Sequence, residues 1–508
     1  MKYANCAFAA LFLVIFAVVG CTRSSVTTND GETLVYVEDT SRPSGPDTRI
    51  VAAPVTAAEI PADQKEWAAK YDAMKKAAVP KAAVPKAAPQ AAAGPKPLAS
   101  PDDIKGVKER VAALKGSVKT AKNGAITSIK LAASGGDDPN SNVTLDDMNR
   151  IGRLGDLESV SFEGAIFTDA FIAPLVNCKK LNSVTINNAD IQDATLEALA
   201  TLPELTYLDI RRDLKLTNAS LEVLKKMPKL AELHAHYNSF TNSGMAKLSK
   251  IPTLKIVDVR GCADVSDNGA KYLARLPELE EVYFRFMITN TGVEHLSAAP
   301  KLRFIEFQDC NDITDAALAS FQKMASLKGL RIFRCKGFLD AAAAGVCVLP
   351  LERLELRDLN VSNAGIAPLA GNKTVKTLEM SELASVDAAG LNTALAGLTG
   401  LEKASFFSIA LNDEGVALLT GNSPELKSLQ LRAVAVTDQG IDSLLSLSKL
   451  ETLDLRENSG LSADALVKLG SLKTLKTLYL KGTGITAKGA ETQLDALKKA
   501  LPKCRIEE

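Results

Sequence analysis

The stretch LETLDL at residues 450–455 decides the fold, because related phrases recur along most of the chain. Close versions are LESVSF at 157–162, LTYLDI at 205–210 and LERLEL at 351–356. Fourteen such units start at residues 157, 181, 205, 230, 254, 279, 302, 327, 351, 375, 401, 426, 450 and 475, a mean period of about 24.5 residues. Residues 126–131, ITSIKL, look like an earlier, irregular unit. Apolar fourth and sixth places alternating with polar places predict a strand with one buried face in each unit.

A helix signal follows each predicted strand. In ten units a Ser or Thr precedes a second apolar run and can accept hydrogen bonds from the first-turn amides: Thr168, Thr217, Thr241, Ser266, Thr289, Thr314, Ser362, Thr437, Ser462 and Thr486. Asp often comes next, as at Asp267, Asp315 and Asp438, where it favours the positive end of the helix dipole. One unit is therefore predicted to be a strand, a turn and a short helix.

A unit of about two dozen residues cannot bury both its strand and its helix face, so neighbouring units must stack to form a core. The pattern LxxLxLxxxx(I/V)(T/S)(D/N)xGLxxLxxLP resembles the leucine-rich repeat, in particular the subclass shared by ribonuclease-inhibitor-like, GALA-like and cysteine-containing repeats. The resemblance covers about residues 126–508. It implies an α/β fold, a horseshoe-shaped leucine-rich-repeat solenoid with a parallel β-sheet on its concave face and helices on its convex face.

The ninth place of each unit carries a further mark of this resemblance. The subclass often has Cys or Asn there, facing the interior of the turn, and this chain has Cys262, Cys310, Cys335, Asn238 and Asn458. Cys310 and Cys335 lie in adjacent units, about 5 Å apart by strand spacing and within disulfide reach, but their side chains should run parallel into the core. Whether these two thiols are bridged stays open at this point.

The N-terminus indicates where the protein is sent. Lys2 precedes an apolar run over residues 7–19, which is too short for a spanning helix and typical of a signal peptide. The end of residues 1–20 together with Cys21 resembles a bacterial lipoprotein cleavage box, which implies a lipidated Cys21 as the first mature residue. Thr22 stands where an aspartate would resemble an inner-membrane retention signal, so we expect an outer-membrane lipoprotein of the cell envelope, periplasmic or surface-facing.

Three further segments follow the signal. Residues 21–99 are predicted to be a flexible Ala/Pro/Lys-rich tether, because prolines between 79 and 97 oppose both helix and sheet. Residues 100–125 are predicted to hold an N-terminal capping helix that starts at Ser100-Pro101-Asp102-Asp103. Residues 126–508 form the repeat domain, with Leu497, Leu501, Pro502, Cys504 and Ile506 as its C-terminal cap.

Composition excludes several classes of function. The 508 residues contain 60 Lys plus Arg and 60 Asp plus Glu, so the total charge gives no footprint for nucleic acid, and we expect no nucleic-acid partner. Three histidines and the absence of CxxC, HExxH, GxSxG and P-loop patterns leave no starting point for zinc, hydrolase or nucleotide chemistry. The sequence therefore predicts no enzyme, no catalytic residue, no cofactor and no metal, in a monomeric protein whose membrane contact is the lipidated cysteine.

The polar strand places should line the concave face, where relatives commonly bind partners. The fifth places lean acidic and the seventh places basic, so four pairs can form as exposed pairs of little energetic value: Asp209–Arg211, Asp258–Arg260, Glu355–Arg357 and Asp454–Arg456. Such a face can be merely a solvated surface. The alternative is a recognition stripe, because arginines and aromatic residues are frequent interface anchors. The predicted partner-binding residues are Tyr207, Asp209, Arg211, His234, His236, Asp258, Arg260, Tyr283, Arg285, Phe333 and Arg357.

One group on this face has an alternative interpretation. His234 and His236 point the same way on one strand, and Asp209 and Asp258 should flank His234 at about 4.8 Å. Two imidazoles and two carboxylates can bind a divalent metal or carry out enzyme chemistry. Residues of opposite sign on a strand also simply hydrogen-bond, and that interpretation is the one we expect here.

These patterns favour a non-enzymatic, lipid-anchored scaffold that binds a protein or peptide on its concave sheet. The alternative from another class is a structural envelope spacer that associates with cell-wall polymer or with copies of itself. The identity of the partner, the side of the outer membrane and the oligomeric state are not encoded in any motif. The unit at 327–350 has Leu339 at the cap place and alanines at 341–344, so we expect a local irregularity there.

Overall fold

The computed structural model describes residues 22–27, 33–38, 100–133 and 142–508. The chain divides into two units, Met1–Gly94 and Pro95–Glu508. In the first unit, β1 (Thr22–Thr27) pairs antiparallel with β2 (Thr33–Glu38). These strands fall inside the predicted tether, and the run LVYV at 34–37 has the high β-propensity that favours a strand. The predicted signal peptide, Cys21 and the rest of the predicted tether lie outside the described residues.

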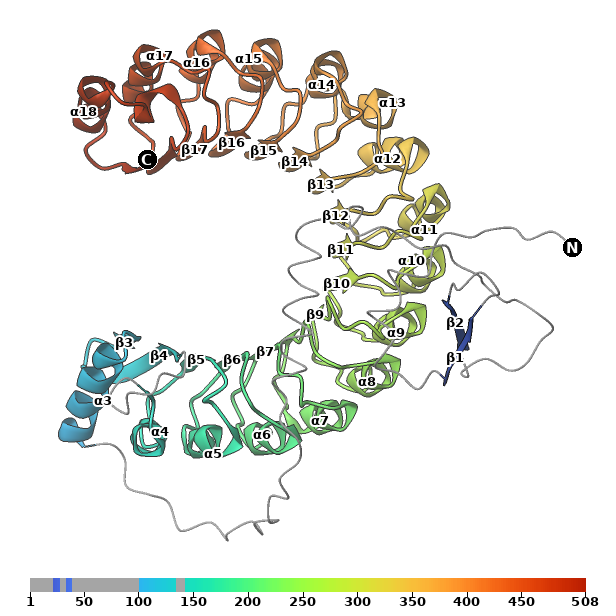
Figure 1. The fold of residues 1–508 in the computed structure, drawn as a ribbon, viewed down its shortest axis with the longest axis vertical. Helices are drawn as coiled ribbons and strands as arrows, with labels where there is room; N and C mark the ends of the chain where they lie inside the picture. The colour runs from blue at the N-terminus through green and yellow to red at the C-terminus, as the bar shows by residue number, and fades with distance from the viewer. Residues whose placement is uncertain (1–21, 28–32, 39–99, 134–141) are drawn as a thin grey trace, which may run out of the picture. The chain divides into compact units, whose positions relative to one another are not determined.

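The second unit contains one sheet of seventeen strands, β3 to β19. From β4 onward every neighbouring pair is parallel, whereas β3 pairs antiparallel with β4. The sheet is open, with β3 at one edge and β19 at the other (Figure 1). Its strands are β3 (Ser117–Thr120), β4 (Ile126–Ala132), β5 (Ser159–Glu163), β6 (Ser183–Asn187), β7 (Tyr207–Arg211), β8 (Glu232–His234), β9 (Ile256–Asp258), β10 (Glu281–Arg285), β11 (Phe304–Gln308), β12 (Gly329–Phe333), β13 (Arg353–Arg357), β14 (Thr377–Ser381), β15 (Lys403–Phe407), β16 (Ser428–Arg432), β17 (Thr452–Asp454), β18 (Thr477–Tyr479) and β19 (Arg505–Glu507).

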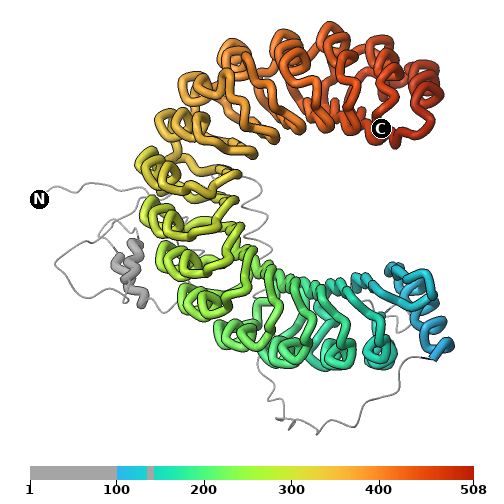
Figure 2. Tube along the Cα trace, turned by 180° about the vertical axis from the view of Figure 1, so that it is seen from behind, coloured from blue at the N-terminus to red at the C-terminus, as the bar shows by residue number. Residues whose placement is uncertain are grey.

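Helices cover the outer side of this unit, and the strands line its inner side (Figure 2). The α-helices are α3 (Pro101–Ala113), α4 (Leu145–Ile151), α5 (Asp169–Ile172), α6 (Asp193–Leu199), α7 (Asn218–Val223), α8 (Asn242–Leu248), α9 (Asp267–Leu273), α10 (Asn290–Leu296), α11 (Leu318–Phe321), α12 (Asp340–Cys347), α13 (Asn363–Ile366), α14 (Ala388–Leu395), α15 (Asp413–Asn422), α16 (Asp438–Leu444), α17 (Ala463–Val467) and α18 (Glu491–Ala500). Short 3₁₀ turns are η2 (Ala173–Asn177), η3 (Leu224–Lys226), η4 (Asp315–Ala317), η5 (Ala367–Leu369), η6 (Lys468–Ser471) and η7 (Gly484–Thr486). The predicted α/β leucine-rich-repeat solenoid is confirmed.

The core runs between the two layers and follows the repeat. The residues at the first, fourth and sixth places, such as Leu205, Leu208 and Ile210, are fully buried between sheet and helices. Burying one such side chain contributes about 1.5–3 kcal/mol, and each is covered from above and below by the units on either side. The places that remain on the inner surface are the third, fifth and seventh.

The eighth place of every unit turns the chain out of the sheet in a left-handed conformation. All fourteen units have a positive φ there, and eleven of them do so without glycine, at φ between 47° and 79°. The N–H of this residue donates to the carbonyl of the seventh residue in the next unit, as from Arg334 to Arg357 and from Asp358 to Ser381. The positive φ therefore extends the sheet ladder by one hydrogen bond and presents the eighth side chain at the edge of the concave face.

The first residue of most helices caps the next helix along the solenoid. Asp267 accepts hydrogen bonds from the backbone N–H and the hydroxyl of Thr289, both at 2.8 Å. In the same way, a backbone N–H of the following unit donates to the side-chain oxygen of each of these residues: Asp193, Asn218, Asn242, Asn290, Asp315, Asp340, Asp413 and Asp438. A Cβ at Gly292 would lie 2.4 Å from Oδ1 of Asp267, so glycine in the helix lets the side chain of the preceding unit reach the cap.

These bonds explain where our prediction for residues 327–350 is wrong. Helix α12 is unbroken over Asp340–Cys347, although Leu339 provides no side-chain cap. Asp315 of the preceding unit accepts hydrogen bonds from the N–H groups of Leu339 and Ala342, both at 3.0 Å. The helical segment is instead divided in both neighbouring units, into η4 and α11 before it and into α13 and η5 after it.

The predicted caps at helix starts are confirmed in most units. Thr217, Thr241, Thr289, Thr314, Ser362, Thr437 and Ser462 accept a hydrogen bond from a first-turn amide, whereas Thr168 and Ser266 occupy the cap position without one. Thr486 was wrongly predicted, because it ends the turn η7 and the next helix starts only at Glu491.

The two ends of the repeat domain are closed as predicted, with one difference. Ser100 and Asp103 form a reciprocal capping box at the start of α3. This helix ends at Ala113, and β3 occupies part of the segment predicted to be helical up to residue 125. At the other end, α18 and β19 provide the last helix and terminal strand. In the described part of the chain, no helix has the length and apolar character needed to cross a membrane.

The ninth-place residues face the interior of the turns. The amide of Asn238 donates to the carbonyl oxygens of Ile210 and Ala235, and the thiol of Cys262 contacts the carbonyl oxygen of Ala235. Cys310 and Cys335 are both buried and unbridged. Burial raises the pKa of the Cys310 thiol well above its ordinary value, so this thiol stays protonated.

Candidate binding surface

The inner strand face carries the predicted partner-binding residues in register. The fifth places of β7, β8 and β9 bring Asp209, His234 and Asp258 side by side, as the sequence predicts. Tyr283, Glu306, Arg331 and Glu355 continue this line across β10 to β13. The central strands of the solenoid therefore hold a continuous line of ionisable side chains.

The carboxylates of this line are buried, which contradicts our expectation of exposed pairs. The exposed fractions of Asp258, Glu306 and Glu355 are 1%, 2% and 5%. We call these three residues the carboxylate row. Their burial results from arginine side chains of neighbouring places and strands, which lie across them and separate them from water. The places in the repeat show which side chains share a face of the sheet. They do not show which of these side chains cover the others.

Arginines bridge the carboxylate row across strands. Arg260 donates to both carboxylate oxygens of Asp258, at 3.0 and 2.7 Å, and to Glu306 two strands further on, at 2.7 Å. Arg331 lies between Glu306 and Glu355, at 3.5 and 3.2 Å. Arg353 also pairs with Glu355. Each buried charge thus has a partner of opposite sign, as a buried charge requires.

Two histidines complete the surroundings of Asp258. Nδ1 of His234 lies 3.8 Å and Nδ1 of His236 lies 3.2 Å from Oδ2 of Asp258. Burial opposes ionisation of this carboxyl, but the nearby imidazoles of His234 and His236 and the hydrogen bonds from Arg260 hold its pKa well below the usual range. Asp258 is therefore a fixed negative charge around which three cationic or polar side chains are held.

The predicted salt bridges within one strand form in three of four cases. Arg211 pairs with Asp209 at 2.6 Å and Arg456 with Asp454 at 2.6 Å, in addition to Arg260 with Asp258. The pair Glu355–Arg357 was wrongly predicted, because Arg357 instead binds Glu382, the eighth-place residue of the next unit, at 2.6 Å. Arg432 binds the eighth-place Glu457 in the same manner. The eighth-place residue, with its left-handed backbone, thus provides carboxylates that lie outside the predicted strand places.

Aromatic rings hold the same arginines from the side. The guanidinium carbon of Arg260 lies 5.2 Å from the ring centre of Tyr283. That of Arg357 lies 4.8 Å from the centre of Phe333 and 5.7 Å from the centre of Phe407. Each guanidinium is fixed by a carboxylate and by a ring face, so its remaining N–H groups are held in place toward the inner side.

Like Asp209 and Asp258, which are each 1% exposed, the predicted contact residue Arg285 is not accessible. Arg285 is only 8% exposed, because it donates to Asp309 at 2.6 Å and to the hydroxyl of Tyr237 at 2.9 Å. Arg334 also binds Asp309. Arg285 is therefore a buried residue that connects neighbouring units and not a contact residue of the surface. Glu306, Arg331, Arg353 and Glu382 are surface-building residues that the sequence analysis did not select.

The structure gives no support to a metal at the histidine pair. Within residues 100–133 and 142–508 no group of three or more His, Cys, Asp or Glu side chains is arranged to hold a metal ion. Asp209 is engaged with Arg211, and Asp258 with Arg260. Tyr207 packs against His234 with ring centres 5.2 Å apart.

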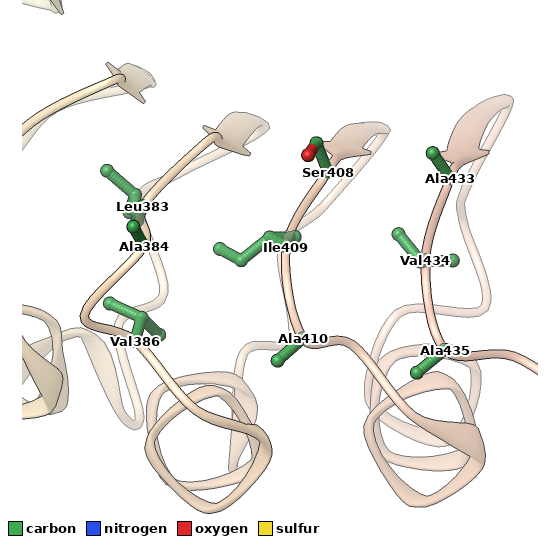
Figure 3. Close-up of a pocket in the computed structure, with 9 residues that line it drawn as sticks. All are labelled: Leu383, Ala384, Val386, Ser408, Ile409, Ala410, Ala433, Val434 and Ala435. Carbon is green, nitrogen blue, oxygen red and sulfur yellow. The ribbon is translucent and has the colours of Figure 1, made fainter.

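Two hollows open beside the strands. The first has a volume of about 440 Å³ and lies where β14, β15 and β16 end, as Figure 3 shows. Its walls are uncharged, with Leu383, Ile409 and Val434 at the ninth places and Ser408 and Ala433 at the eighth places. The second has a volume of about 310 Å³ and lies where β10 to β15 begin. In contrast to the first hollow, most of the residues that line it are charged.

Comparisons with known proteins agree with the repeat architecture. A sequence profile described as a leucine-rich repeat matches residues 250–274. This profile match falls within the repeats, whose strand and helix units show the leucine-rich-repeat fold. No curated protein matches the chain.

Solved structures with similar backbones are distant in sequence. TLR13 in complex with ssRNA13 is 18% identical at a TM-score of 0.44, and the alignment covers 66% of this chain and 57% of that one. A leucine-rich-repeat protein of Leptospira interrogans is 13% identical at a TM-score of 0.35, covering 81% and 100%. An internalin of Listeria monocytogenes is 19% identical at 0.29, covering 80% and 94%. The chain thus spans little more than half of the length of TLR13.

Proposed function

We propose that this protein is a non-enzymatic, lipid-anchored binding scaffold of the cell envelope. A signal peptide over residues 1–20 directs export, Cys21 carries the lipid at the outer membrane, and the repeat domain binds a protein or peptide through its concave sheet. The strands that bind are β7 to β13. The leucine-rich-repeat solenoid commonly acts as a protein-interaction scaffold, and the detailed surface of this chain supports that use.

The observation that carries the proposal is the buried carboxylate row beneath the arginines. Burying an ion pair contributes little net stability, because desolvation offsets the attraction, so stability alone does not explain the row. What the row does is hold Arg260, Arg331 and Arg353 in fixed positions. Side chains that are ordered before binding lose less entropy when a partner arrives, and arginines beside aromatic rings are typical binding anchors.

The test of binding uses Arg211 and Arg357 and leaves the arginines over the carboxylate row intact. Arg357 and Arg211 have side-chain exposed fractions of 30% and 39% and take part in one salt bridge each. A partner captured from envelope extract by the purified chain and identified by mass spectrometry should lose at least tenfold in affinity for Arg211→Glu/Arg357→Glu. Lys271→Glu on the outer helix α9 is the matched control and should bind normally. Equal binding by the double variant would contradict the proposal.

The anchor needs a separate experiment. The chain produced in a bacterial host should carry a diacylglycerol mass on Cys21 and appear in the outer-membrane fraction. Cys21→Ala should remain unmodified and leave that fraction. Retention of residues 21–99 alone on purified peptidoglycan, without any partner for the repeats, would instead support the structural spacer.

A further inference from the structure

The groove where β10 to β15 begin differs from the rest of the inner surface. Third-place residues line up along the start of these strands as Glu281, Phe304, Gly329, Arg353, Thr377 and Lys403. Gly329 interrupts this row of side chains. The ring of Phe304 lies against the glycine, since a Cβ there would be 2.5 Å from Cδ2 of Phe304. The floor of the groove is thus a glycine and a flat ring.

Arg353 on β13 forms one wall of this groove, on the side of Gly329 that faces away from β11. Its guanidinium carbon lies 4.5 Å from the ring centre of Phe304, and its side chain is 45% exposed. The same guanidinium pairs with the buried Glu355. The groove is therefore a built feature whose arginine is held by both a ring and a carboxylate.

The charges along the groove are unbalanced. Arg303, Lys328, Arg353, Lys376 and Lys403 line it with Glu281, Glu352 and Glu402, five cations against three anions.

Most second-place charges along this edge alternate and pair, as Lys255 with Glu280 and Lys427 with Glu402. Lys328 follows Arg303 and breaks the alternation. Lys328 and Lys403 have no side-chain ion pair or hydrogen bond with any of the described residues.

From these observations we infer that the groove binds an acidic, extended peptide segment of the partner. This inference rests on the proposed binding function and names the partner chemistry at one part of the same inner surface. Lys328 and Lys403 stand three strands apart, about 14 Å at the usual strand spacing. An extended peptide rises about 3.3 Å per residue, so side chains four residues apart span about 13 Å on one face. Carboxylates at the first and fifth residues of such a segment match Lys328 and Lys403.

The test uses labelled peptides of defined sequence on the purified full chain. The probe is Gly-Glu-Ser-Glu-Ser-Glu-Gly, compared with the same peptide carrying Gln or Lys in place of Glu, and with citrate as a small anion. Fluorescence anisotropy should detect the Glu peptide alone, with an affinity that falls as salt is raised. Lys328→Glu/Lys403→Glu should weaken it by at least about tenfold. Lys130→Glu, a reversal of an exposed lysine on β4 of the same face, is the matched control and should bind as the unchanged chain does.

A second variant changes the shape of the groove without changing its charge. Gly329→Ala should push the ring of Phe304 into the groove and weaken the Glu peptide several-fold, while a thermal melt verifies the fold. The inference is overturned by the absence of binding at millimolar peptide, by equal binding of the Gln peptide, by unchanged binding in the double variant, or by citrate that displaces the labelled peptide as well as unlabelled Glu peptide does. A partner that is lost with Arg211→Glu/Arg357→Glu and kept with Lys328→Glu/Lys403→Glu would leave the scaffold function standing and discard the groove alone.

Discussion

Strands β4 to β6 and strands β9 to β13 share one backbone and carry opposite kinds of inner surface. The first group has small hydroxyl side chains at its third places, such as Ser128, Ser159 and Ser183. The second group has buried carboxylates, arginines and aromatic rings. Both groups pair in the same parallel register over the same leucine core. Because the hydroxyl strands fold with no buried charges on this face, the repeat itself does not need them, and their presence in the centre points to recognition.

The largest expected effect is on the free energy of unfolding and comes from removing one carboxylate of the carboxylate row. Asp258→Ala removes two of the three side-chain hydrogen bonds of Arg260 and leaves its guanidinium with Glu306 and with two histidines beside it. Breaking a buried pair by removing one partner usually costs about 3–5 kcal/mol of the free energy of unfolding, and we expect a loss near the lower end because Glu306 still compensates Arg260. Thr185→Ala, at the same fifth place on β6, should cost below about 1 kcal/mol. Urea unfolding followed by circular dichroism measures both, and equal losses would remove the distinction between the two regions.

The second prediction concerns the unit between the two regions. Asp213 occupies the ninth place behind β7 and is fully buried; its Oδ1 accepts from the N–H of Ala189 at 2.7 Å, and its Oδ2 has no hydrogen-bond partner among the described residues. Burial raises its pKa to about 8, from an ordinary value of 3.8. The folded chain therefore holds this proton while the unfolded chain releases it. The corresponding contribution to stability is present below about pH 4 and is lost as the pH rises towards 8.

Asp213→Asn should remove this pH dependence. An amide at the ninth place can donate to carbonyl oxygens of the turn, as Asn238 does. We expect the variant to match the unchanged chain near pH 4 and to exceed it by a few kcal/mol at pH 8, because the unchanged chain must take up a proton to fold there and the amide need not. Thermal melts of both chains at pH 4, 6 and 8 provide the measurement. A difference that stays constant over this range would show that Asp213 is ionised in the folded chain.

The outer helical layer should not distinguish the two regions, and the third prediction tests this. Asp315→Ala removes the hydrogen bonds to the start of α12, which has no cap residue of its own. We expect a loss of about 1–2 kcal/mol. Asp193→Ala removes the equivalent bonds to Thr217, but Thr217 also caps its own helix, so a smaller loss is expected. Thermal unfolding compares them. A larger loss for Asp193→Ala would show that position along the solenoid matters more than the local cap.

Repeat period and capping residues were sufficient to predict the fold. Periodic leucines placed the strands, and Ser or Thr placed most helix starts, because both act within one unit. The cap of α12 was missed because its acceptor, Asp315, lies in the preceding unit. The left-handed eighth place was missed because most of its residues, such as Arg334 and Glu382, are not glycine. Local chemistry is readable in a sequence, whereas bonds between units require the stacking to be known.

The binding surface was predictable in outline and not in depth. The fifth places of the units correctly predicted that Asp209, His234 and Asp258 lie side by side. They could not show that Arg260 reaches Glu306, 46 residues later, because this contact crosses the strand of Tyr283. Nor could they show that Arg285 turns away to Asp309 and becomes buried. Long side chains choose among several partners, and only the curvature and packing of the sheet decide between them.

The smallest expected effect lies in the hydroxyl strands and sharpens the comparison from the other side. The hydroxyl of Ser159 donates to that of Ser128 at 2.7 Å, across β5 and β4. Ser159→Ala should cost about 0.5–1 kcal/mol, because both hydroxyls are only half-buried and water can replace the lost partner. Ser183→Ala, at the same place on β6, should cost less, since its side chain has no hydrogen-bond partner in the described part of the chain. If urea unfolding gave a loss near that of Asp258→Ala, the hydroxyl strands would depend on their polar contacts as strongly as the centre does. The buried charges would then no longer mark the centre as the part of the sheet reserved for a partner.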